Sequence, residues 1–153
     1  MYKSGGLFQA GKMADGIKEW DGGLADMDRA VELEPKSVGV RIPRAAVLTS
    51  ASSAAPPAMA KPLLEKLRGD MEYSLQSHGK DWADLGDHNK GEVRMALAYA
   101  YRRLNEPDKS AAQLKLVTEE LTGSKWATRA EEWLKAKPDA KLTHNCIGCH
   151  KGG

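Results

Sequence analysis

The residues best suited to chemistry lie together near the C-terminus. The chain of 153 residues has only two cysteines, and both belong to one short string, Cys146-Ile147-Gly148-Cys149-His150. Two intervening residues place the thiols about one helical turn apart, and the imidazole of His150 follows at once. Thiolate and imidazole groups are ligands for metals, and thiols also form covalent bonds to cofactors. The string therefore predicts a cofactor or metal site.

This Cys-x-x-Cys-His string resembles the haem attachment site of c-type cytochromes. In that family the two thiols add to the vinyl groups on one edge of a porphyrin, and the adjacent histidine ligates the iron. The resemblance implies one covalent haem c, attached through Cys146 and Cys149, with His150 as the proximal iron ligand. Because a thioether bond does not dissociate, a short tail with little enclosing protein can keep such a group.

Three other interpretations of the same string remain open. A thioredoxin-like dithiol uses Cys-x-x-Cys, although it belongs beside a strand, and no strand pattern surrounds this one. A zinc ion suits sulfur and imidazole ligands, although all four groups lie so close that one ion would bind them under strain. A disulfide would close a very small loop and stabilise little. The zinc ligands would be His144, Cys146, Cys149 and His150.

The ligand on the other side of the iron decides the redox potential and whether small molecules bind. His78 and His88 flank the segment 79–87 between two expected helices, so either is a candidate distal ligand. An exposed loop histidine without any ligand role is the competing interpretation of both. Three methionines lie on apolar stripes typical of a core and two are undecided. The three on apolar stripes are Met27, Met71 and Met95, and the two undecided ones are Met13 and Met59.

The rest of the chain carries a helical pattern. Apolar residues return at intervals of three and four, and strand signals are scarce, so we expect an all-α fold. Pro43 suits a first helical turn, Gly79 follows an apolar stripe, and Pro107 and Gly123 bracket one helix. The expected helices are about 6–18, 22–34, 43–53, 57–77, 89–104, 108–121 and 125–136.

Two segments, 4–37 and 91–124, resemble tetratricopeptide repeats, which are helix-turn-helix units of about 34 residues. The resemblance implies a stack of helical hairpins, with a longer unit between the two matching ones. In the first segment the matches are Leu7, Ala10, Gly11, Ala14, Gly23, Met27, Ala30 and Pro35, with Trp20 near the turn. In the second they are Leu97, Ala98, Tyr101, Ser110, Leu114 and Val117, with Arg94 in place of the usual bulky opening residue.

We therefore expect two parts: a helical repeat domain over 1–137, and a haem attachment segment over 138–153. The helix carrying Trp126, Ala130, Trp133 and Leu134 is expected to cap the stack. A four-helix-bundle cytochrome with the motif near its C-terminus is the alternative architecture. In that family the motif lies on the last long helix, whereas Pro138, Gly148 and Gly152 favour a loose tail here.

Composition excludes some classes of function. The 23 basic and 21 acidic residues leave a net charge of +2, too small for the basic surface that nucleic-acid binding requires. No apolar run is long enough to span a membrane, and the first six residues lack the apolar core of a secretory signal. Acidic pairs such as Glu119-Glu120 indicate solvated surface.

These observations predict an electron-transfer protein rather than an enzyme. We expect a monohaem cytochrome whose helical scaffold docks a redox partner protein; a homo-oligomer is left open. Because c-type haem attachment takes place outside the bacterial cytoplasm, the resemblance implies a periplasmic or otherwise exported protein. The alternatives are a haem enzyme or gas sensor with an open distal position, and an interaction adaptor with a zinc-bound tail.

Overall fold

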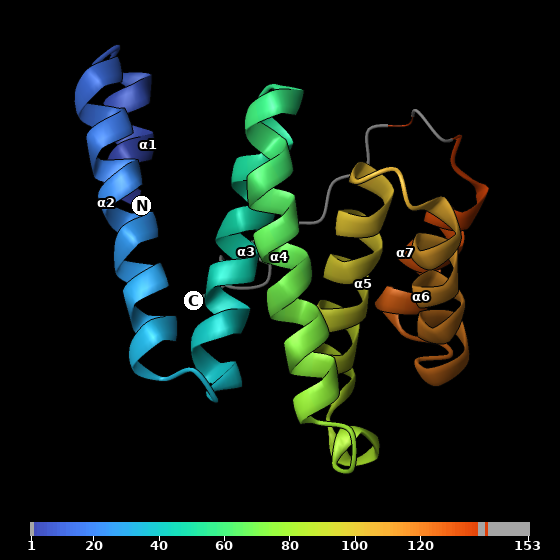
Figure 1. The fold of residues 1–153 in the computed structure, drawn as a ribbon. Coiled ribbons are helices and arrows are strands. Elements are labelled where there is room, and N and C mark those ends of the chain that lie inside the picture. Colours follow the sequence, from blue (N-terminus) through green and yellow to red (C-terminus); the bar gives the residue numbers. More distant parts are fainter. Residues whose placement is uncertain (1, 138–139, 141–153) are drawn as a thin grey trace. The chain divides into compact units, whose positions relative to one another are not determined.

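The computed structural model describes residues 2–137 and residue 140. Within this range the chain forms seven α-helices and one short 3-10 turn, η1, with no strand (Figure 1). The predicted all-α class and the helical hairpin arrangement are therefore confirmed for the described residues. The helices are α1 (Tyr2–Gln9), α2 (Met13–Leu33), α3 (Val38–Ala54), α4 (Pro57–Ser77), α5 (Asp87–Arg103), α6 (Pro107–Glu120) and α7 (Lys125–Lys135), and η1 is Trp82–Asp84.

The chain divides into two compact units, 1–40 and 41–153. The first contains the hairpin of α1 and α2, and the second contains the core of α4 to α7. The predicted tail, 138–153, lies outside the described residues except for Ala140. The division into a repeat domain over 1–137 and an attachment segment therefore stays a prediction.

The helix boundaries expected in the first unit are wrong. The break lies at 10–12 rather than at 19–21, and α2 runs without interruption through Trp20 and the two glycines that follow it. Gly11 has a φ of 72°, a conformation that glycine adopts easily at the end of a helix. A glycine inside a helix costs only about 1 kcal/mol, so Gly22 and Gly23 did not end this one.

The corrected boundary removes the basis for the first expected repeat. Ala10 and Gly11 lie in the turn instead of the first helix, and Trp20 lies in the middle of α2. The contact between α1 and α2 depends on Gly16, because a Cβ atom there would come within 2.5 Å of the Phe8 ring. An ion pair between Lys3 and Glu19, at 2.8 Å, also joins the two helices.

Helix α5 is the centre of the second unit. It contacts α4, α6 and α7, and Figure 1 shows it between α4 and the α6–α7 pair. Every residue from Gly91 to Tyr101 is buried. A helix that is buried on every face forms the centre of the core. Each buried polar side chain on it requires a hydrogen-bond partner.

Most boundaries in the second unit agree with the sequence pattern. Helix α4 begins and ends where expected, and α5, α6 and α7 agree to within two residues at each end. Helix α3 is the exception, because it begins at Val38 and Pro43 lies inside it. Proline lacks an amide hydrogen, so one backbone bond is lost early in α3, but the helix continues through it.

A buried cluster of charges joins α3 to α4. Asp70, which is 1% exposed, accepts hydrogen bonds from two guanidinium groups. Arg44 donates through Nε at 2.7 Å and Nη2 at 2.6 Å, and Arg41 donates through Nη1 at 2.8 Å. The Arg41 guanidinium also stacks on Tyr73, 4.0 Å from the ring centre. One carboxylate thus compensates two cations that the fold has removed from water.

A second polar network joins α4 to the turn between α5 and α6. Tyr101 donates its hydroxyl hydrogen to Glu72 at 2.7 Å, and Arg68 binds Glu106 at 2.9 Å. Burial, reinforced by the Glu72 carboxylate, raises the pKa of Tyr101 well above its usual value. The hydrogen bond from Lys109 lowers the pKa of Glu106. Tyr101 therefore remains a donor, and Glu106 remains charged, at neutral pH.

The close approach of α7 to α5 makes a testable prediction. A Cβ atom on Gly91 would lie 2.4 Å from the Trp126 ring, which is buried. We expect Gly91→Ala to lower the free energy of unfolding by about 1–3 kcal/mol, because Trp126 has to shift within a packed core.

The control is Gly69→Ala on exposed α4 surface, where a Cβ atom meets nothing within 4 Å. That change should stabilise the protein by about 0.5–1 kcal/mol through higher helix propensity. Urea unfolding followed by circular dichroism measures both. Equal midpoints for the two variants would contradict the prediction.

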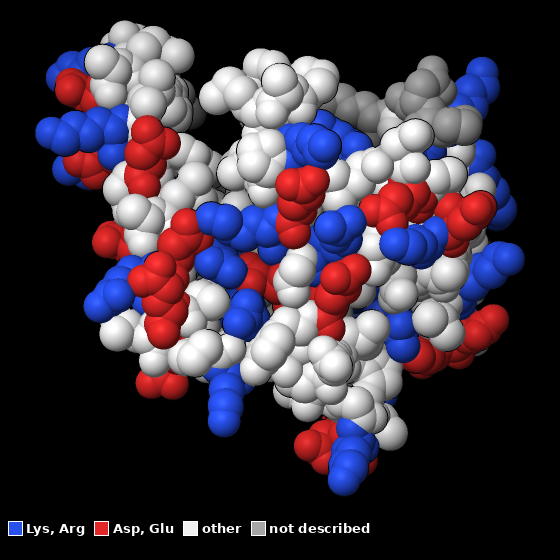
Figure 2. All heavy atoms as spheres, viewed as in Figure 1, with Lys and Arg blue, Asp and Glu red and all other residues white. Residues whose placement is uncertain are grey.

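No helix among the described residues is long and apolar enough to cross a membrane. On the face drawn in Figure 2, basic and acidic side chains are interspersed in both units. This agrees with the small net charge of +2. Electrostatic steering by a large field of one sign is therefore not a property of this face.

Candidate functional site

The string that carries the predicted chemistry lies outside the described residues. Cys146, Cys149 and His150 are therefore not described, and neither is His144 of the zinc interpretation. The structure describes the helices before them, and it places both candidate distal ligands, His78 and His88.

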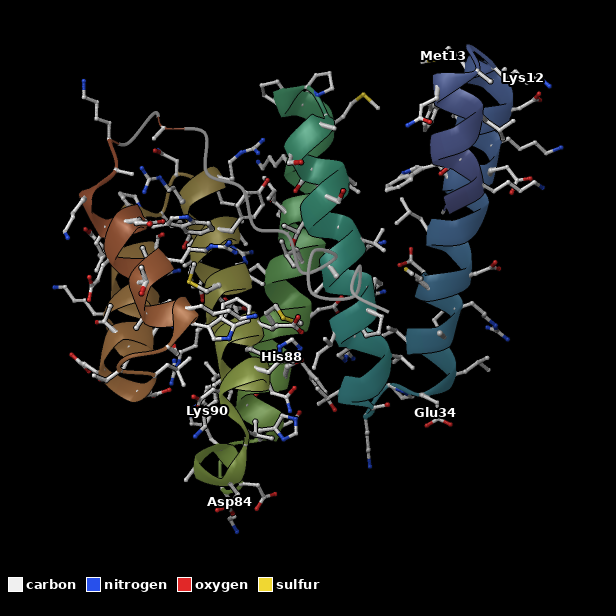
Figure 3. All side chains as sticks on the ribbon, turned by 180° about the vertical axis from the view of Figure 1, so that it is seen from behind. Lys12, Met13, Glu34, Asp84, His88 and Lys90 are labelled. Carbon is white, nitrogen blue, oxygen red and sulfur yellow. The ribbon has the colours of Figure 1, made fainter. Side chains whose placement is uncertain are left out.

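His88 lies in the first turn of α5. Its side chain is 48% exposed, and its Nε2 atom lies 3.4 Å from Oε1 of Glu92, one turn along the helix. The imidazole also faces Trp126, with ring centres 6.1 Å apart and planes inclined by 56°. Figure 3 shows His88 on α5 near the turn that carries Asp84. The ring is half open to solvent and held on one side by the protein.

His78 is the residue that ends α4. It is half-buried, and its backbone amide donates to the carbonyl of Ser74 at 3.2 Å. The nine residues between His78 and His88 contain η1, so the two histidines flank one connection, as the sequence indicated. A ligand role for either one stays a prediction.

The connection between these histidines is fixed by an arginine that sequence analysis had treated only as a departure from a repeat motif. Arg94 of α5 stacks on Trp82, 4.7 Å from the ring centre. It binds both carboxylate oxygens of Glu120, at 2.6 and 2.8 Å, and Trp82 donates to the same carboxylate at 3.1 Å. Glu120 lies on the surface as the sequence indicated, and its carboxylate also pairs with a buried cation, which the sequence did not indicate.

In the second unit, the methionines on apolar stripes are buried, as the sequence pattern indicated. Met71 and Met95 are fully buried core residues, so neither can reach an external iron without unpacking the fold. Met13 and Met59, which were undecided, are 58% and 66% exposed. Met27 in the first unit is half-buried.

Helix α7 covers the α5–α6 hairpin, as expected of the last helix. Ser124 caps it by accepting hydrogen bonds from the amides of Trp126 and Ala127, both at 3.2 Å. Trp126, Ala130 and Trp133 are buried, whereas Leu134 is 39% exposed. Both tryptophans are therefore core residues.

The end of α7 is held by a residue that sequence analysis did not identify. Arg102, in the last turn of α5, donates to the carbonyl oxygens of Trp133 at 3.1 Å and Ala136 at 3.3 Å, and also to that of Lys137. A cation in the last turn of a helix is common, so no local signal linked Arg102 to a segment more than 30 residues away. This arginine fixes the point where the chain leaves α7.

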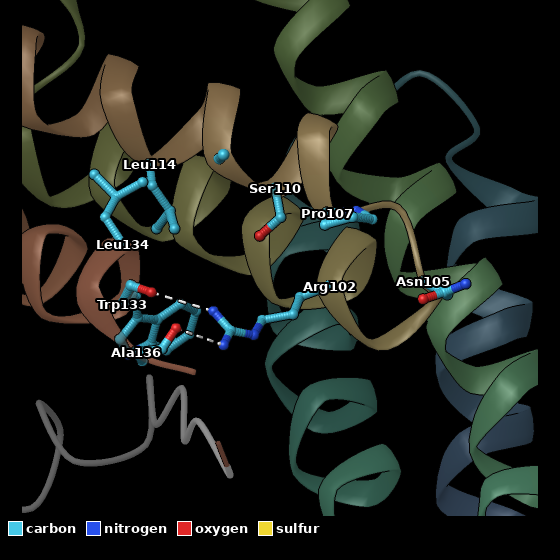
Figure 4. Close-up of a pocket in the computed structure, with 9 residues that line it drawn as sticks. Arg102, Asn105, Pro107, Ser110, Leu114, Trp133, Leu134 and Ala136 are labelled. Carbon is cyan, nitrogen blue, oxygen red and sulfur yellow. Dashed lines mark hydrogen bonds between the residues drawn. The ribbon is translucent and has the colours of Figure 1, made fainter. Parts of the chain in front are cut away.

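A cavity of about 290 Å³ adjoins this point. Figure 4 shows residues from α5, α6 and α7 around it, with Leu114 and Leu134 together at one side of the view. Its lining is Arg102, Asn105, Pro107, Ser110, Ala111, Leu114, Trp133, Leu134 and Ala136. The Ser110 hydroxyl is already bonded to the carbonyl of Ala98, at 2.8 Å. The lining is therefore mainly apolar, with the cation of Arg102 and the amide of Asn105 as further polar groups.

Within residues 2–137 and 140, no three histidine, cysteine, aspartate or glutamate side chains gather as metal ligands would. Comparison of the chain with protein-family models, with curated proteins and with solved structures gives no match. The string near the C-terminus is therefore the feature of this chain that points to a function.

Proposed function

We propose that this protein is a monohaem c-type cytochrome that transfers electrons. The observation that carries the proposal is the string from Cys146 to His150, which contains both cysteines of the chain and a histidine directly after the second. Coincidence is a poor explanation for that arrangement.

The donor set suits haem c. Cys146 and Cys149 would supply two thiols three positions apart, a spacing that suits addition to two vinyl groups, and His150 would supply an imidazole for the iron. When bound, haem supplies a one-electron couple between ferrous and ferric iron. The roles of the chain are to hold that group covalently, to provide the proximal ligand and to set its surroundings. His78 and His88 are the described histidines that remain candidates for the sixth position.

The helical hairpins supply the scaffold in this proposal. In the α5–α6 hairpin, which carries the second tetratricopeptide-like segment, the matching residues Leu97, Ala98, Tyr101, Ser110 and Leu114 are all buried, and this supports a packing role for them. Stacked hairpins of this kind present extended surfaces for proteins. We therefore propose that the scaffold docks a redox partner protein, and that the chain acts in the periplasm or another exported compartment, where c-type haem is attached.

A single sample tests the proposal. The protein, produced with an export signal in a host that matures c-type cytochromes, should show a Soret band and a reduced-minus-oxidised spectrum. Its mass should exceed that of the polypeptide by one haem, and a pyridine haemochrome assay should give the c-type spectrum. A colourless sample with the mass of the polypeptide would refute the proposal, and stoichiometric zinc in it would favour the adaptor alternative.

Carbon monoxide distinguishes electron transfer from the gas-sensor alternative. A low-spin reduced spectrum that the gas does not change is expected if a protein ligand occupies the sixth position. A large spectral change on adding the gas would show an open position and favour the sensor or enzyme.

A further inference from the structure

The cavity beside the end of α7 has the features of a binding site for part of an acidic, largely apolar ligand. At about 290 Å³ it lies at the lower end of the range for ligand pockets, so it suits one edge of a large group rather than the whole. Leu114 and Trp133 form buried apolar walls, and Leu134 is 39% exposed at its rim. Leu134 therefore adds exposed apolar surface next to the buried walls.

Arg102 provides the charge. Its described hydrogen bonds go to the carbonyl oxygens of Trp133, Ala136 and Lys137, which carry only partial charges. The positive charge of the guanidinium is therefore not neutralised by these bonds. The same bonds hold the guanidinium in place, which reduces the entropy lost when an anionic group meets it.

We propose that this cavity receives one edge of the haem carried by Cys146 and Cys149, with Arg102 facing a propionate. The inference rests on the proposed function and deepens it. The continuous described chain ends next to this cavity, since Ala136 is part of its lining and Lys137 follows it. Nine residue steps separate Lys137 from Cys146 and span at most about 30 Å, so this cavity is within reach of a porphyrin attached at Cys146.

This placement has a consequence for the sixth iron position. His88 lies 14 residues before Arg102 on α5, which corresponds to about 21 Å along the helix. A porphyrin with one edge at Arg102 does not bring its iron to an imidazole at the other end of α5. Docking in the cavity and ligation by His88 are therefore mutually exclusive, and we expect that His88 is not the ligand.

Two neighbouring residues on α6 allow a matched test in the haem-loaded protein. Ala111 lines the cavity and is half-buried, whereas Ala112 is exposed and does not line it. Ala111→Phe should fill the cavity and reduce the Soret circular dichroism several-fold, because a displaced haem loses its asymmetric surroundings. Ala112→Phe should leave the signal unchanged. Far-ultraviolet circular dichroism checks that both variants fold.

Two neighbouring arginines test the charge. Arg102→Gln should lower the reduction potential, because a positive charge beside the haem favours the reduced form. Arg103 is the control, since it carries the same charge but binds the Tyr99 hydroxyl at 2.9 Å and the Ser52 carbonyl at 3.2 Å. Arg103→Gln should leave the potential near that of the unchanged protein.

His88→Ala completes the test and should leave the visible spectrum unchanged. A changed sixth ligand in His88→Ala, or equal Soret signals in the two alanine variants, would overturn the docking inference while leaving the haem itself established. A Soret signal that rises with protein concentration would place the haem in the cavity of a second copy and would overturn it too. A wild-type sample without haem would instead refute the proposed function.

Discussion

Replacing both Cys146 and Cys149 by serine is expected to remove all covalently bound haem. Serine hydroxyls do not add to vinyl groups as thiols do, and no other cysteine occurs in the chain. The helical signal should persist, because all seven described helices end before residue 136. Mass spectrometry of the denatured protein measures the attached group, and circular dichroism at 222 nm measures the helices.

His144→Ala is the matched control, because it changes a residue two positions before the string and leaves all three attachment residues in place. It should keep a full complement of covalent haem. Haem that passes from the denatured, unchanged protein into acidified organic solvent would disprove attachment. Helicity lost together with haem in the double variant would show instead that the scaffold depends on the cofactor.

Asp70→Asn is expected to lower the free energy of unfolding strongly. The carboxylate is 1% exposed and accepts three hydrogen bonds from Arg41 and Arg44. Asparagine keeps the shape but removes the negative charge that both guanidinium groups contact. Loss of one partner from a buried pair costs about 3–5 kcal/mol. This is a large share of the total stability of a typical domain, about 5–15 kcal/mol.

Glu65→Gln on the same helix is the control. Its partner Lys61 lies 3.9 Å away, and both side chains are exposed. Surface pairs of this kind contribute about 0–1 kcal/mol, so its urea midpoint should remain close to that of the unchanged protein. If Asp70→Asn unfolds at the same urea concentration as Glu65→Gln, the buried cluster does not stabilise the fold as argued.

The sequence predicted much of the helical structure, because its signals are local. The 3.6-residue period of apolar side chains, the prolines at 57 and 107, and Gly123 with its φ of 79° located α4 to α7 closely. The first unit shows where local signals are insufficient. Several glycines occur there, and only the backbone shows that Gly11 interrupts the helices while Gly22 lies inside one.

Contacts between distant residues were not predicted. Glu120 appeared as one of two surface acids, yet it binds Arg94 from 26 positions away. Asp70 gave no sign of two arginine partners, and Arg102 gave no sign of holding the end of α7. These contacts depend on which helix faces are brought together, and the spacing of residues along one helix does not specify that.

The amino-acid sequence by itself determined the chemical proposal, because two thiols and an imidazole at adjacent positions need no fold to be recognised as a set. It also determined the all-α class, since the helical period of apolar side chains can be recognised from residues close together in the sequence. Only the tertiary structure decided that α5 is buried on all sides, and that Arg102, Leu114 and Trp133 meet around one cavity. The physical reason is that packing brings together residues from separate helices. Which residues meet depends on how all the helix faces pack against one another.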